Sequence, residues 1–217
     1  MAKQKASQDT IKRLFLYYRT ILESTDIKVV SSEELAKRTG VPAALIRKDL
    51  SFFGEFGTPG KGYYIDNLSN HLKKILGMDR DWEVALVGVG NMGRALLTYP
   101  KFKLQGFKIS QIFDSAPDKI GKTCAGFRIK DIADIKQVLQ KEGESGRMNI
   151  AIVTVPANVA QEVANILVDA GVRAILNFAP AQLFVPENVI VTNIDVSNEM
   201  ARLTYFLSQE ESEDKSQ

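Results

Sequence analysis

The chain has 217 residues, of which 45% are hydrophobic and 25% charged, a composition typical of a soluble globular protein. No apolar run approaches the roughly 20 residues that a bilayer-spanning helix needs. The first ten residues are polar and contain no apolar signal segment. These features argue against a membrane protein, and we expect a cytoplasmic one.

The formal net charge of +2 is unevenly distributed along the chain. Residues 1–80 contain 14 Lys or Arg against 9 Asp or Glu, whereas residues 81–217 contain 14 against 17. This asymmetry indicates that only the first part binds a polyanion such as DNA. Cys124 and His71 are the only residues of their kinds. An internal disulfide is therefore impossible, and we expect no zinc cluster or other metal site.

Helices with the order of a helix-turn-helix are predicted near the start of the chain. Residues 8–23 carry apolar side chains at helical spacing. Ser31 and Glu34 have the spacing of a capping box, which would begin a second helix that Gly40 ends. Pro42 suits the first turn of a third helix. A short helix, a glycine-containing turn and another helix form the helix-turn-helix pattern.

A glycine-rich loop at residues 54–62 follows the third helix and predicts a tight, irregular turn. Residues 63–65 then favour a β-strand. A β-hairpin behind a helix-turn-helix is a wing, so we predict an N-terminal winged-helix domain over residues 1–80. One more helix is expected at residues 67–77, and residues 77–81 are expected to form a linker.

Basic side chains on the third helix and the wing are candidates for DNA contacts. Arg47 can pair bidentately with guanine, and Lys48 can contact a phosphate or a base. Asp49 would be costly against phosphate, so we expect it to orient a basic neighbour. Lys61 lies between two glycines, and a basic tip of this kind can enter the minor groove. A solvated charged surface is the alternative for each residue. Lys12, Arg13 and Ser32 are further candidates, for phosphate contacts. The candidate DNA-binding residues are Lys12, Arg13, Ser32, Arg47, Lys48, Lys61, Gly62 and Tyr63.

The composition changes at Trp82, where strands rich in Val, Ile and Ala begin to alternate with helices. Strands are expected at residues 82–90, 108–114, 149–155, 173–177 and 189–193, and helices at about 92–99, 131–141 and 158–170. Strands that alternate with helices imply a parallel sheet with helices on both faces. We therefore predict the α/β class, with a Rossmann-type doubly wound parallel sheet over residues 81–194.

Residues 88–93 match G-x-G-x-x-G between a predicted strand and a predicted helix. Gly88 permits the tight turn, Gly90 lets the backbone approach a pyrophosphate, and Gly93 allows the helix to pack closely on the strand. The helix N-terminus offers N–H groups to the phosphates. Asp114 ends the next strand, where its carboxylate can accept hydrogen bonds from ribose hydroxyls and would repel a 2′-phosphate. The pattern favours NAD(H) over NADP(H) as the cofactor.

Two further segments, Thr154–Ala157 and Asn177–Pro180, follow predicted strands at the edge of the sheet where ligands bind. Both can line the nicotinamide side, and ordinary strand-to-helix turns are the alternative explanation. The candidate cofactor-binding residues are Gly88, Val89, Gly90, Asn91, Met92, Gly93, Asp114, Thr154, Val155, Pro156, Asn177, Phe178, Ala179 and Pro180.

A dehydrogenase would need a substrate domain and usually a His, Lys or Tyr acid/base beside the nicotinamide. Nothing of domain size follows the Rossmann unit, and the one His precedes it. We therefore expect a sensor with no catalytic residues. Three alternatives remain open: a small NAD- or coenzyme-A-dependent enzyme, a DNA-binding protein whose Rossmann unit only supports dimerisation, and a glycine turn without any ligand.

A helix with a large apolar surface is expected after the sheet, at residues 197–208. Its apolar face consists of Met200, Leu203, Thr204 and Leu207, with Tyr205 and Phe206 beside it. A surface of this kind must dock on its own domain or on a partner chain. Residues 209–217 are charged and are predicted to be a disordered tail.

Several strings in the chain resemble the Rex family of redox-sensing transcriptional repressors. They are Val41-Pro42, IRKDLSFFGEFG from Ile46, GKGYY from Gly60, VGVGNMG from Val87 and NFAP from Asn177. The resemblance extends from about residue 8 to residue 208. The IRKDLSFFGEFG string is specific to this family, whereas the glycine motif is shared with many proteins.

The resemblance implies a homodimer in which the C-terminal helix, residues 195–208, is swapped onto the partner chain. It also implies repression of genes for NADH-consuming or fermentative metabolism. NAD⁺ would permit binding to an inverted-repeat operator in double-stranded DNA, whereas NADH would close the dimer and release the operator.

A switching network is similar too, and its matching residues are Arg19, Tyr99 and Asp195. In the family, residues at these positions exchange partners with the redox state of the nicotinamide. The physical reason is that NAD⁺ carries a positive charge that NADH lacks, so a nearby carboxylate can respond to it.

Two positions depart from the family pattern. Pro59 stands in the wing where relatives often carry a basic residue, and Lys61 is the candidate replacement. Asn91 stands where some members have Arg, so a pyrophosphate contact is not expected from that side chain.

Overall fold

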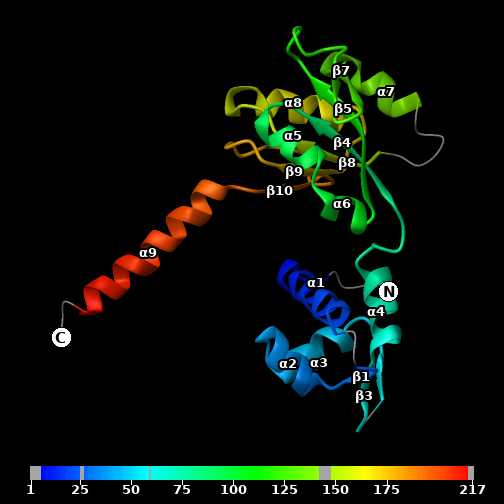
Figure 1. The fold of residues 1–217 in the computed structure, drawn as a ribbon, viewed down its shortest axis with the longest axis vertical. Coiled ribbons are helices and arrows are strands. Elements are labelled where there is room, and N and C mark those ends of the chain that lie inside the picture. The colour runs from blue at the N-terminus through cyan, green and yellow to red at the C-terminus, as the bar shows by residue number, and fades with distance from the viewer. Residues whose placement is uncertain (1–5, 25–26, 59, 142–147, 215–217) are drawn as a thin grey trace. The chain divides into compact units, whose positions relative to one another are not determined.

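The computed structural model of the chain describes residues 6–24, 27–58, 60–141 and 148–214. The chain divides into two compact units, residues 1–80 and residues 81–217 (Figure 1). The boundary falls just before Trp82, where the composition changes.

Unit 1, residues 1–80, is a winged helix (Figure 1). Its helices are α1 (Gln8–Leu22), α2 (Ser32–Thr39), α3 (Ala43–Ser51) and α4 (Ile65–Ile75). Its strands are β1 (Val29–Val30), β2 (Gly57–Thr58) and β3 (Gly62–Tyr64), which form an antiparallel sheet in the order β1-β3-β2. The predicted winged helix is thus confirmed.

Local sequence explains where the helices of unit 1 begin and end. The Ser31 hydroxyl accepts a hydrogen bond from the Glu34 N–H at 3.0 Å and begins α2. The capping box is incomplete, because the Glu34 carboxylate pairs with Arg38 at 2.8 Å instead. Gly40 ends α2 with a φ of 71°, a left-handed conformation that glycine adopts at no steric cost. Ile65 was expected in the strand, but it begins α4.

The core of unit 1 joins all four described helices to the wing. Its apolar side chains are almost completely buried, and the sheet contributes to it from β1 and β3. The buried members are Leu14, Tyr17, Ile21, Val30, Leu35, Ile46, Leu50, Tyr63, Leu68 and Leu72. Burial of this set fixes α3 and the wing in one rigid arrangement.

Unit 2 is built on a seven-stranded sheet in its described part. The strands are β4 (Trp82–Val87), β5 (Phe107–Asp114), β6 (Thr123–Cys124), β7 (Phe127–Asp131), β8 (Ile150–Val153), β9 (Ala174–Asn177) and β10 (Ile190–Asn193). Their order is β10-β9-β8-β4-β5-β7-β6, and every neighbouring pair is parallel except β6 with β7. Without β6, this is the order of the dinucleotide-binding fold. The predicted Rossmann-type sheet is therefore confirmed.

Helices cover both faces of this sheet, because its strands are apolar on both sides. Helices α5 (Asn91–Leu97) and α6 (Pro100–Leu104) pack on one face. Helices α7 (Ile135–Lys141) and α8 (Ala157–Asp169) pack on the other, where the short helix η1 (Ile132–Asp134) precedes α7. In β4, Val84 and Leu86 face α5, whereas Ala85 and Val87 face α8, as the two-residue period of a strand requires.

Strands β6 and β7 and helix α6 were not predicted from the sequence. In β7, Ile129 is buried while Arg128 is exposed, and Lys130 also points away from the Ile129 side. This alternation over a few residues lacks the apolar run that marks the central strands. Helix α6 begins at Pro100, stops before Gly106 and is only five residues long, below the length at which helical periodicity is visible.

The last helix, α9 (Val196–Asp214), is longer than expected. Residues 209–214, predicted to belong to a disordered tail, are helical, and residues 215–217 lie outside the described part of the chain. Every residue from 196 to 209 is exposed. The predicted apolar face, including Leu203 and Leu207, is therefore uncovered in the single chain.

Candidate cofactor site and DNA-binding surface

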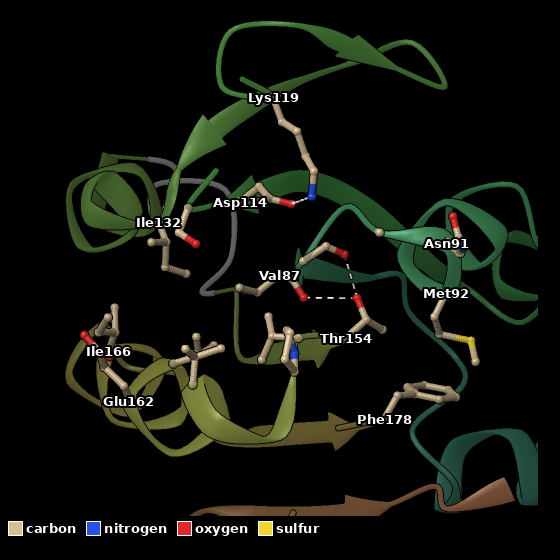
Figure 2. A pocket seen from close by; sticks show the side chains of 17 residues that line it. Val87, Asn91, Met92, Asp114, Lys119, Ile132, Thr154, Glu162, Ile166 and Phe178 are labelled. Carbon is tan, nitrogen blue, oxygen red and sulfur yellow. Dashed lines mark hydrogen bonds and ion pairs between the residues drawn. The ribbon is translucent and has the colours of Figure 1, made fainter. Parts of the chain in front are cut away.

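A cavity of about 510 Å³ lies at the carboxyl ends of β4, β5 and β8 (Figure 2). The chain leaves neighbouring strands β4 and β8 towards opposite faces of the sheet, and ligands of such folds bind at this point. The volume is within the range of small-molecule sites. The cavity is lined by Val87, Gly88, Gly90, Asn91, Met92, Asp114, Ser115, Lys119, Ile132, Thr154, Val155, Pro156, Val159, Glu162, Val163, Ile166 and Phe178.

The three glycines at positions 88, 90 and 93, after β4, are needed for different reasons. Gly88 has a φ of 96°, and a Cβ there would lie 2.6 Å from the carbonyl oxygen of Thr154. A Cβ on Gly93 would overlap the carbonyl of Gly88. At Gly90, by contrast, a Cβ would meet no atom within 4 Å. Gly88 and Gly93 are thus required by the fold, whereas Gly90 keeps open a space beside the N-terminus of α5.

Asp114, at the end of β5, is 7% exposed and accepts hydrogen bonds from two backbone N–H groups. Its Oδ2 atom accepts from Val89 at 2.8 Å, and its Oδ1 atom accepts from Ala116 at 2.9 Å. The Lys119 ammonium lies 2.9 Å from Oδ2 (Figure 2). Burial alone would raise the pKa of Asp114, but these donors outweigh it and hold the pKa below its ordinary value. The carboxylate is therefore ionised at neutral pH.

Two polar residues that were expected to line the nicotinamide side, Thr154 and Asn177, bond to the backbone around them. The Thr154 hydroxyl donates to the carbonyl oxygens of Val87 and Gly88, at 3.1 and 2.7 Å, and ties β8 to β4. The Asn177 side chain is fully buried and bonds to Ala179 and to Asn193. Thr154 still borders the cavity, whereas Asn177 does not.

The cavity brings together most of the predicted cofactor residues and adds others. Of the predicted set, Val89, Gly93, Asn177, Ala179 and Pro180 do not line it. The residues that sequence reasoning missed are Val87, Ser115, Lys119, Ile132, Val159, Glu162, Val163 and Ile166. The last four share one face of α8 at spacings of three and four residues, so the helical period would have located them.

On unit 1, a groove of about 650 Å³ separates the N-terminus of α2 and the helix α3 from the wing. The predicted DNA residues Ser32, Arg47, Lys61, Gly62 and Tyr63 line this groove. Residues from the start of α2, the end of α3, the α3–β2 connection and the wing complete it, namely Ser31, Glu33, Leu50, Ser51, Gly54, Glu55, Phe56, Gly57, Thr58 and Gly60.

Arg47 projects from α3 and is held at one nitrogen. Its Nη1 atom donates to the Ser32 hydroxyl at 2.6 Å and to the Glu33 carboxylate at 2.8 Å. Ser32 is buried, and its hydroxyl also donates to Glu33 at 3.1 Å. Hydrogen bonds from its own backbone, Arg47 and Ser32 lower the pKa of Glu33. Ser32 thus orients Arg47, a role that its interpretation as a phosphate contact did not include.

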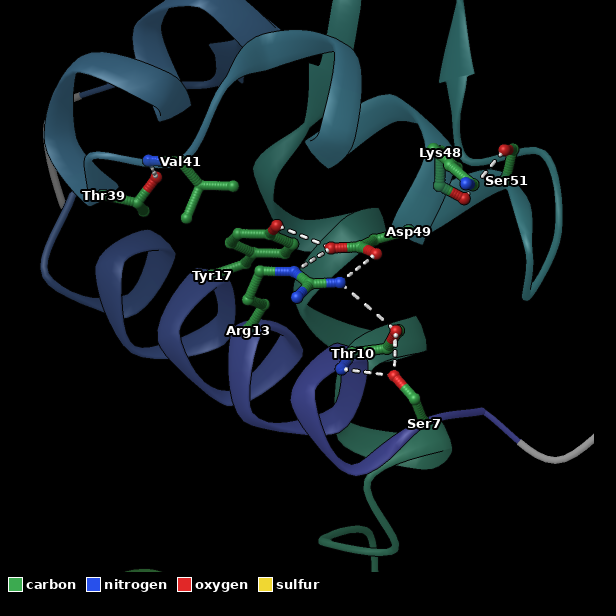
Figure 3. Close-up of polar contacts among 9 residues, drawn as sticks. All are labelled: Ser7, Thr10, Arg13, Tyr17, Thr39, Val41, Lys48, Asp49 and Ser51. Carbon is green, nitrogen blue, oxygen red and sulfur yellow. Dashed lines mark hydrogen bonds and ion pairs between the residues drawn. The ribbon is translucent and has the colours of Figure 1, made fainter.

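Arg13, a candidate for phosphate contact, already has partners within unit 1. Its guanidinium binds both oxygens of Asp49 on α3, at 2.6 and 2.7 Å, and Tyr17 donates to the same carboxylate at 2.8 Å (Figure 3). Thr10 accepts a further bond from Arg13 at 3.2 Å. Burial alone would raise the pKa of Asp49, but the hydrogen bonds from Arg13 and Tyr17 outweigh it, so the pKa lies below its ordinary value. Asp49 does orient a basic side chain, and the pair locks α3 onto α1.

The remaining candidate DNA-binding residues differ in how exposed they are and in what they contact. Lys12 is exposed on α1 and lies 3.9 Å from Asp9. Lys48 and Lys61 are exposed on α3 and on the wing. Tyr63 is only 9% exposed and belongs to the core, and burial raises its pKa. Gly62 is required by packing, because a Cβ there would lie 2.6 Å from a backbone oxygen of β1. Pro59 lies outside the described residues.

The three residues matched to the family switch each have a local partner. Arg19, on α1, lies 4.0 Å from Glu23, the residue that caps the end of this helix. Tyr99 caps α6, is partly exposed and packs edge-to-face on Phe102. Asp195 accepts from the backbone and side-chain nitrogens of Asn198, at 3.0 and 2.8 Å, near the start of α9.

In the described parts of the chain, no cluster of three His, Cys, Asp or Glu side chains could hold a metal ion. Within the same residues, no helix combines the length and apolar character needed to cross a membrane.

A winged helix followed by a dinucleotide-type sheet with an open glycine-loop cavity defines the class of ligand-responsive DNA-binding regulators.

Known proteins of this class match nearly the whole chain. The family described as "CoA binding domain" matches residues 79–181, and the one described as "Putative DNA-binding protein N-terminus" matches residues 5–51. The "Redox-sensing transcriptional repressor Rex" of Chloroflexus aurantiacus is 44% identical over 203 residues, 93% of this chain and 94% of the relative. That of Desulfitobacterium hafniense is 43% identical over 207 residues, 94% and 97% of the two chains.

Solved structures of Rex-family repressors are also similar to this chain. The Rex-family repressor RSP in complex with β-NAD⁺ and operator DNA has a TM-score of 0.91 at 36% identity, covering 98% of this chain and 97% of that one. RSP in complex with β-NADH has a TM-score of 0.85 at 34% identity, covering 99% and 100%. The chain therefore belongs to the Rex family of redox-sensing transcriptional repressors, and its relatives are named as repressors and not as enzymes.

Proposed function

We propose that this chain is a cytoplasmic transcriptional repressor that binds an inverted-repeat operator and is released from it by NADH. The observation that carries the proposal is the cavity at the carboxyl ends of β4 and β8. It joins an open glycine loop to an ionised carboxylate, in a chain that also has a winged helix. NADH would bind in the cavity of unit 2, and the operator would bind to the winged helix of unit 1.

The cofactor would lie along the cavity with its pyrophosphate beside Gly90 and its adenosine ribose at Asp114. The space at Gly90 and the N-terminus of α5 suit a pyrophosphate. The apolar residues of α8 and Ile132 suit the flat adenine. Phe178 and Met92 border the opposite end, where the nicotinamide would lie (Figure 2).

On the DNA side, Arg47 and Lys48 would enter the major groove and Lys61 the minor groove. Arg47 bonds through Nη1 alone to Ser32 and Glu33. Its Nε and Nη2 atoms form the fork that pairs with the O6 and N7 atoms of guanine. An operator that is an inverted repeat requires a second copy of the winged helix related by two-fold symmetry.

The second copy would be held through α9. The exposed apolar side chains of this helix, such as Leu203 and Phe206, need a cover that the single chain does not provide. In the dimer, each α9 would be swapped onto the partner chain. Asp195, at the start of α9, would then join Arg19 and Tyr99 in the network that responds to the charge of the nicotinamide.

A gel-shift titration tests this function. The probe is an operator duplex selected by the purified full chain from a randomised pool. NADH is expected to abolish the shifted complex at concentrations where NAD⁺, NADPH and coenzyme A leave it intact. A complex indifferent to NADH would contradict the proposal. Release by coenzyme A alone would instead support the ligand named in the family matched by residues 79–181.

A further inference from the structure

The carboxylate of Asp114 is nearly saturated before any ligand arrives. It already accepts from the N–H groups of Val89 and Ala116 and from the Lys119 ammonium. A carboxylate offers about four acceptor positions, so about one is left for a ligand. A ribose presents two hydroxyls on adjacent carbons, so Asp114 alone cannot serve both.

Lys119 can supply the missing contact. Its side chain lines the cavity, is 31% exposed, and uses one of its three N–H donors on Asp114. Its ammonium and the Asp114 carboxylate lie side by side at the same end of the cavity (Figure 2). A hydroxyl placed between the two groups can donate to Asp114 or accept from Lys119.

The same pair changes the electrostatic interpretation of this end of the cavity. Asp114 was expected to repel a 2′-phosphate through its negative charge, but Lys119 compensates that charge at 2.9 Å. Among the described residues that line the cavity, Lys119 is the only basic one. An ammonium held beside a carboxylate is a phosphate ligand once the carboxylate is removed.

We propose that Lys119 is the second ligand of the adenosine ribose, and that the Asp114–Lys119 ion pair selects an unmodified ribose over a 2′-phosphorylated one. Asp114 holds the Lys119 ammonium in a position where the ammonium can bind a ribose hydroxyl. The Asp114 carboxylate also occupies the space, and the Lys119 N–H donor, that a 2′-phosphate would need. This inference rests on the proposed binding of NADH in the cavity. It makes Lys119, rather than Asp114 alone, a determinant of cofactor specificity.

The test compares the dissociation constants of NADH and NADPH, measured by nicotinamide fluorescence, for the full chain and three variants. Asp114→Ser is expected to weaken NADH binding at least tenfold and to tighten NADPH binding at least tenfold. Asp114→Ser combined with Lys119→Ala is expected to lose the gain in NADPH affinity. Lys119→Ala alone is expected to weaken NADH binding roughly fivefold, the effect of one hydrogen bond.

Two results would overturn the inference: a gain in NADPH affinity that persists without Lys119, or an unchanged NADH affinity in Lys119→Ala. Asp114→Ser combined with Lys119→Arg provides the rescue, because a conserved charge must keep the gain. Thermal melting identifies any variant that fails to fold. If Asp114→Ser fails to fold, the NADH affinity of Lys119→Ala still tests the inference. Absence of NADH binding by the unaltered chain would contradict the proposed function instead.

Discussion

At the residue scale, the two glycines that flank the start of α5 illustrate how one motif combines structural and binding roles. Gly93 faces the carbonyl of Gly88, and no side chain fits between them. Gly90 faces empty space, and its φ of −86° is open to any residue. The fold therefore requires Gly93, whereas Gly90 is explained by the proposed pyrophosphate rather than by packing.

Substitution of these two glycines separates folding from binding. Gly90→Ala is expected to melt at the temperature of the unaltered chain but to lose NADH affinity at least tenfold, because the methyl group occupies the place of the pyrophosphate. Gly93→Ala is expected to melt at a lower temperature, because α5 must move away from β4. Thermal melting and NADH fluorescence measure the two effects. Normal NADH binding by Gly90→Ala would place the pyrophosphate elsewhere.

The buried carboxylate of Asp49 makes the stability of unit 1 dependent on pH. Its pKa is lowered in the folded chain, so the ionised carboxylate stabilises the fold above its ordinary pKa of 3.8. This stabilisation is lost as the pH falls from about 4 through the lowered pKa. Asp49→Asn removes one partner of the pair with Arg13 and is expected to cost roughly 3 kcal/mol at pH 7.

Urea unfolding followed by circular dichroism between pH 2 and pH 7 measures this effect. In Asp49→Asn, the loss of stability below pH 4 should become smaller than in the unaltered chain. Asp9→Asn is the matched control, since Asp9 is an exposed residue of α1 whose only charged neighbour given by the structure is Lys12 at 3.9 Å. Equal stability of Asp49→Asn and Asp9→Asn would show that the Arg13–Asp49 pair does not hold α3.

Sequence patterns located residues with local signatures and missed those defined by tertiary packing. Asp114 follows from its place at the end of a strand after the glycine loop. The pairing of Arg13 with Asp49 joins positions 36 residues apart, and no pattern in the sequence marks it. Lys119 enters the cavity through a turn after β5, whose path depends on the unpredicted strands β6 and β7.

At the element scale, the long apolar strands were predictable, because burial on both faces leaves continuous runs of Val, Ile and Ala. The shorter elements β6, β7 and α6 were not, because they are brief or carry charged side chains on an outer face. The terminal helix α9 was predicted as a helix, but its end was placed six residues early, at residue 208 instead of Asp214. Charged residues 209–214 extend the helix without apolar periodicity.

The exposed face of α9 predicts how the chain associates. Leu203→Glu is expected to convert the proposed dimer into monomers, because a carboxylate cannot be buried against an apolar partner surface without a large cost. Sedimentation velocity measures the mass. Arg202→Gln is the matched control, since Arg202 is exposed on the same helix and pairs with Glu199 at 3.0 Å. A dimer that survives Leu203→Glu would contradict the swapped arrangement of α9.

At the scale of the whole molecule, the proposed function requires that the cofactor and the operator bind to different units and oppose each other. Such coupling is a single free energy shared by both ligands, so it must be reciprocal. In the proposed dimer two NADH molecules oppose one operator, so the factor by which saturating NADH weakens operator affinity must equal the product of the factors by which the operator weakens the two NADH affinities. A factor of 5–150 corresponds to the roughly 1–3 kcal/mol typical of allosteric proteins.

The most direct test is therefore the full set of four dissociation constants, measured on one preparation of the chain at one salt concentration. Operator affinity is measured by fluorescence anisotropy with and without saturating NADH, and NADH affinity by fluorescence with and without saturating operator. We predict that the ratio of the operator dissociation constants equals the square of the ratio of the NADH dissociation constants per site, and that both ratios are well above one. Ratios of one for both ligands would show that the winged helix and the cofactor cavity act independently, and would contradict the account.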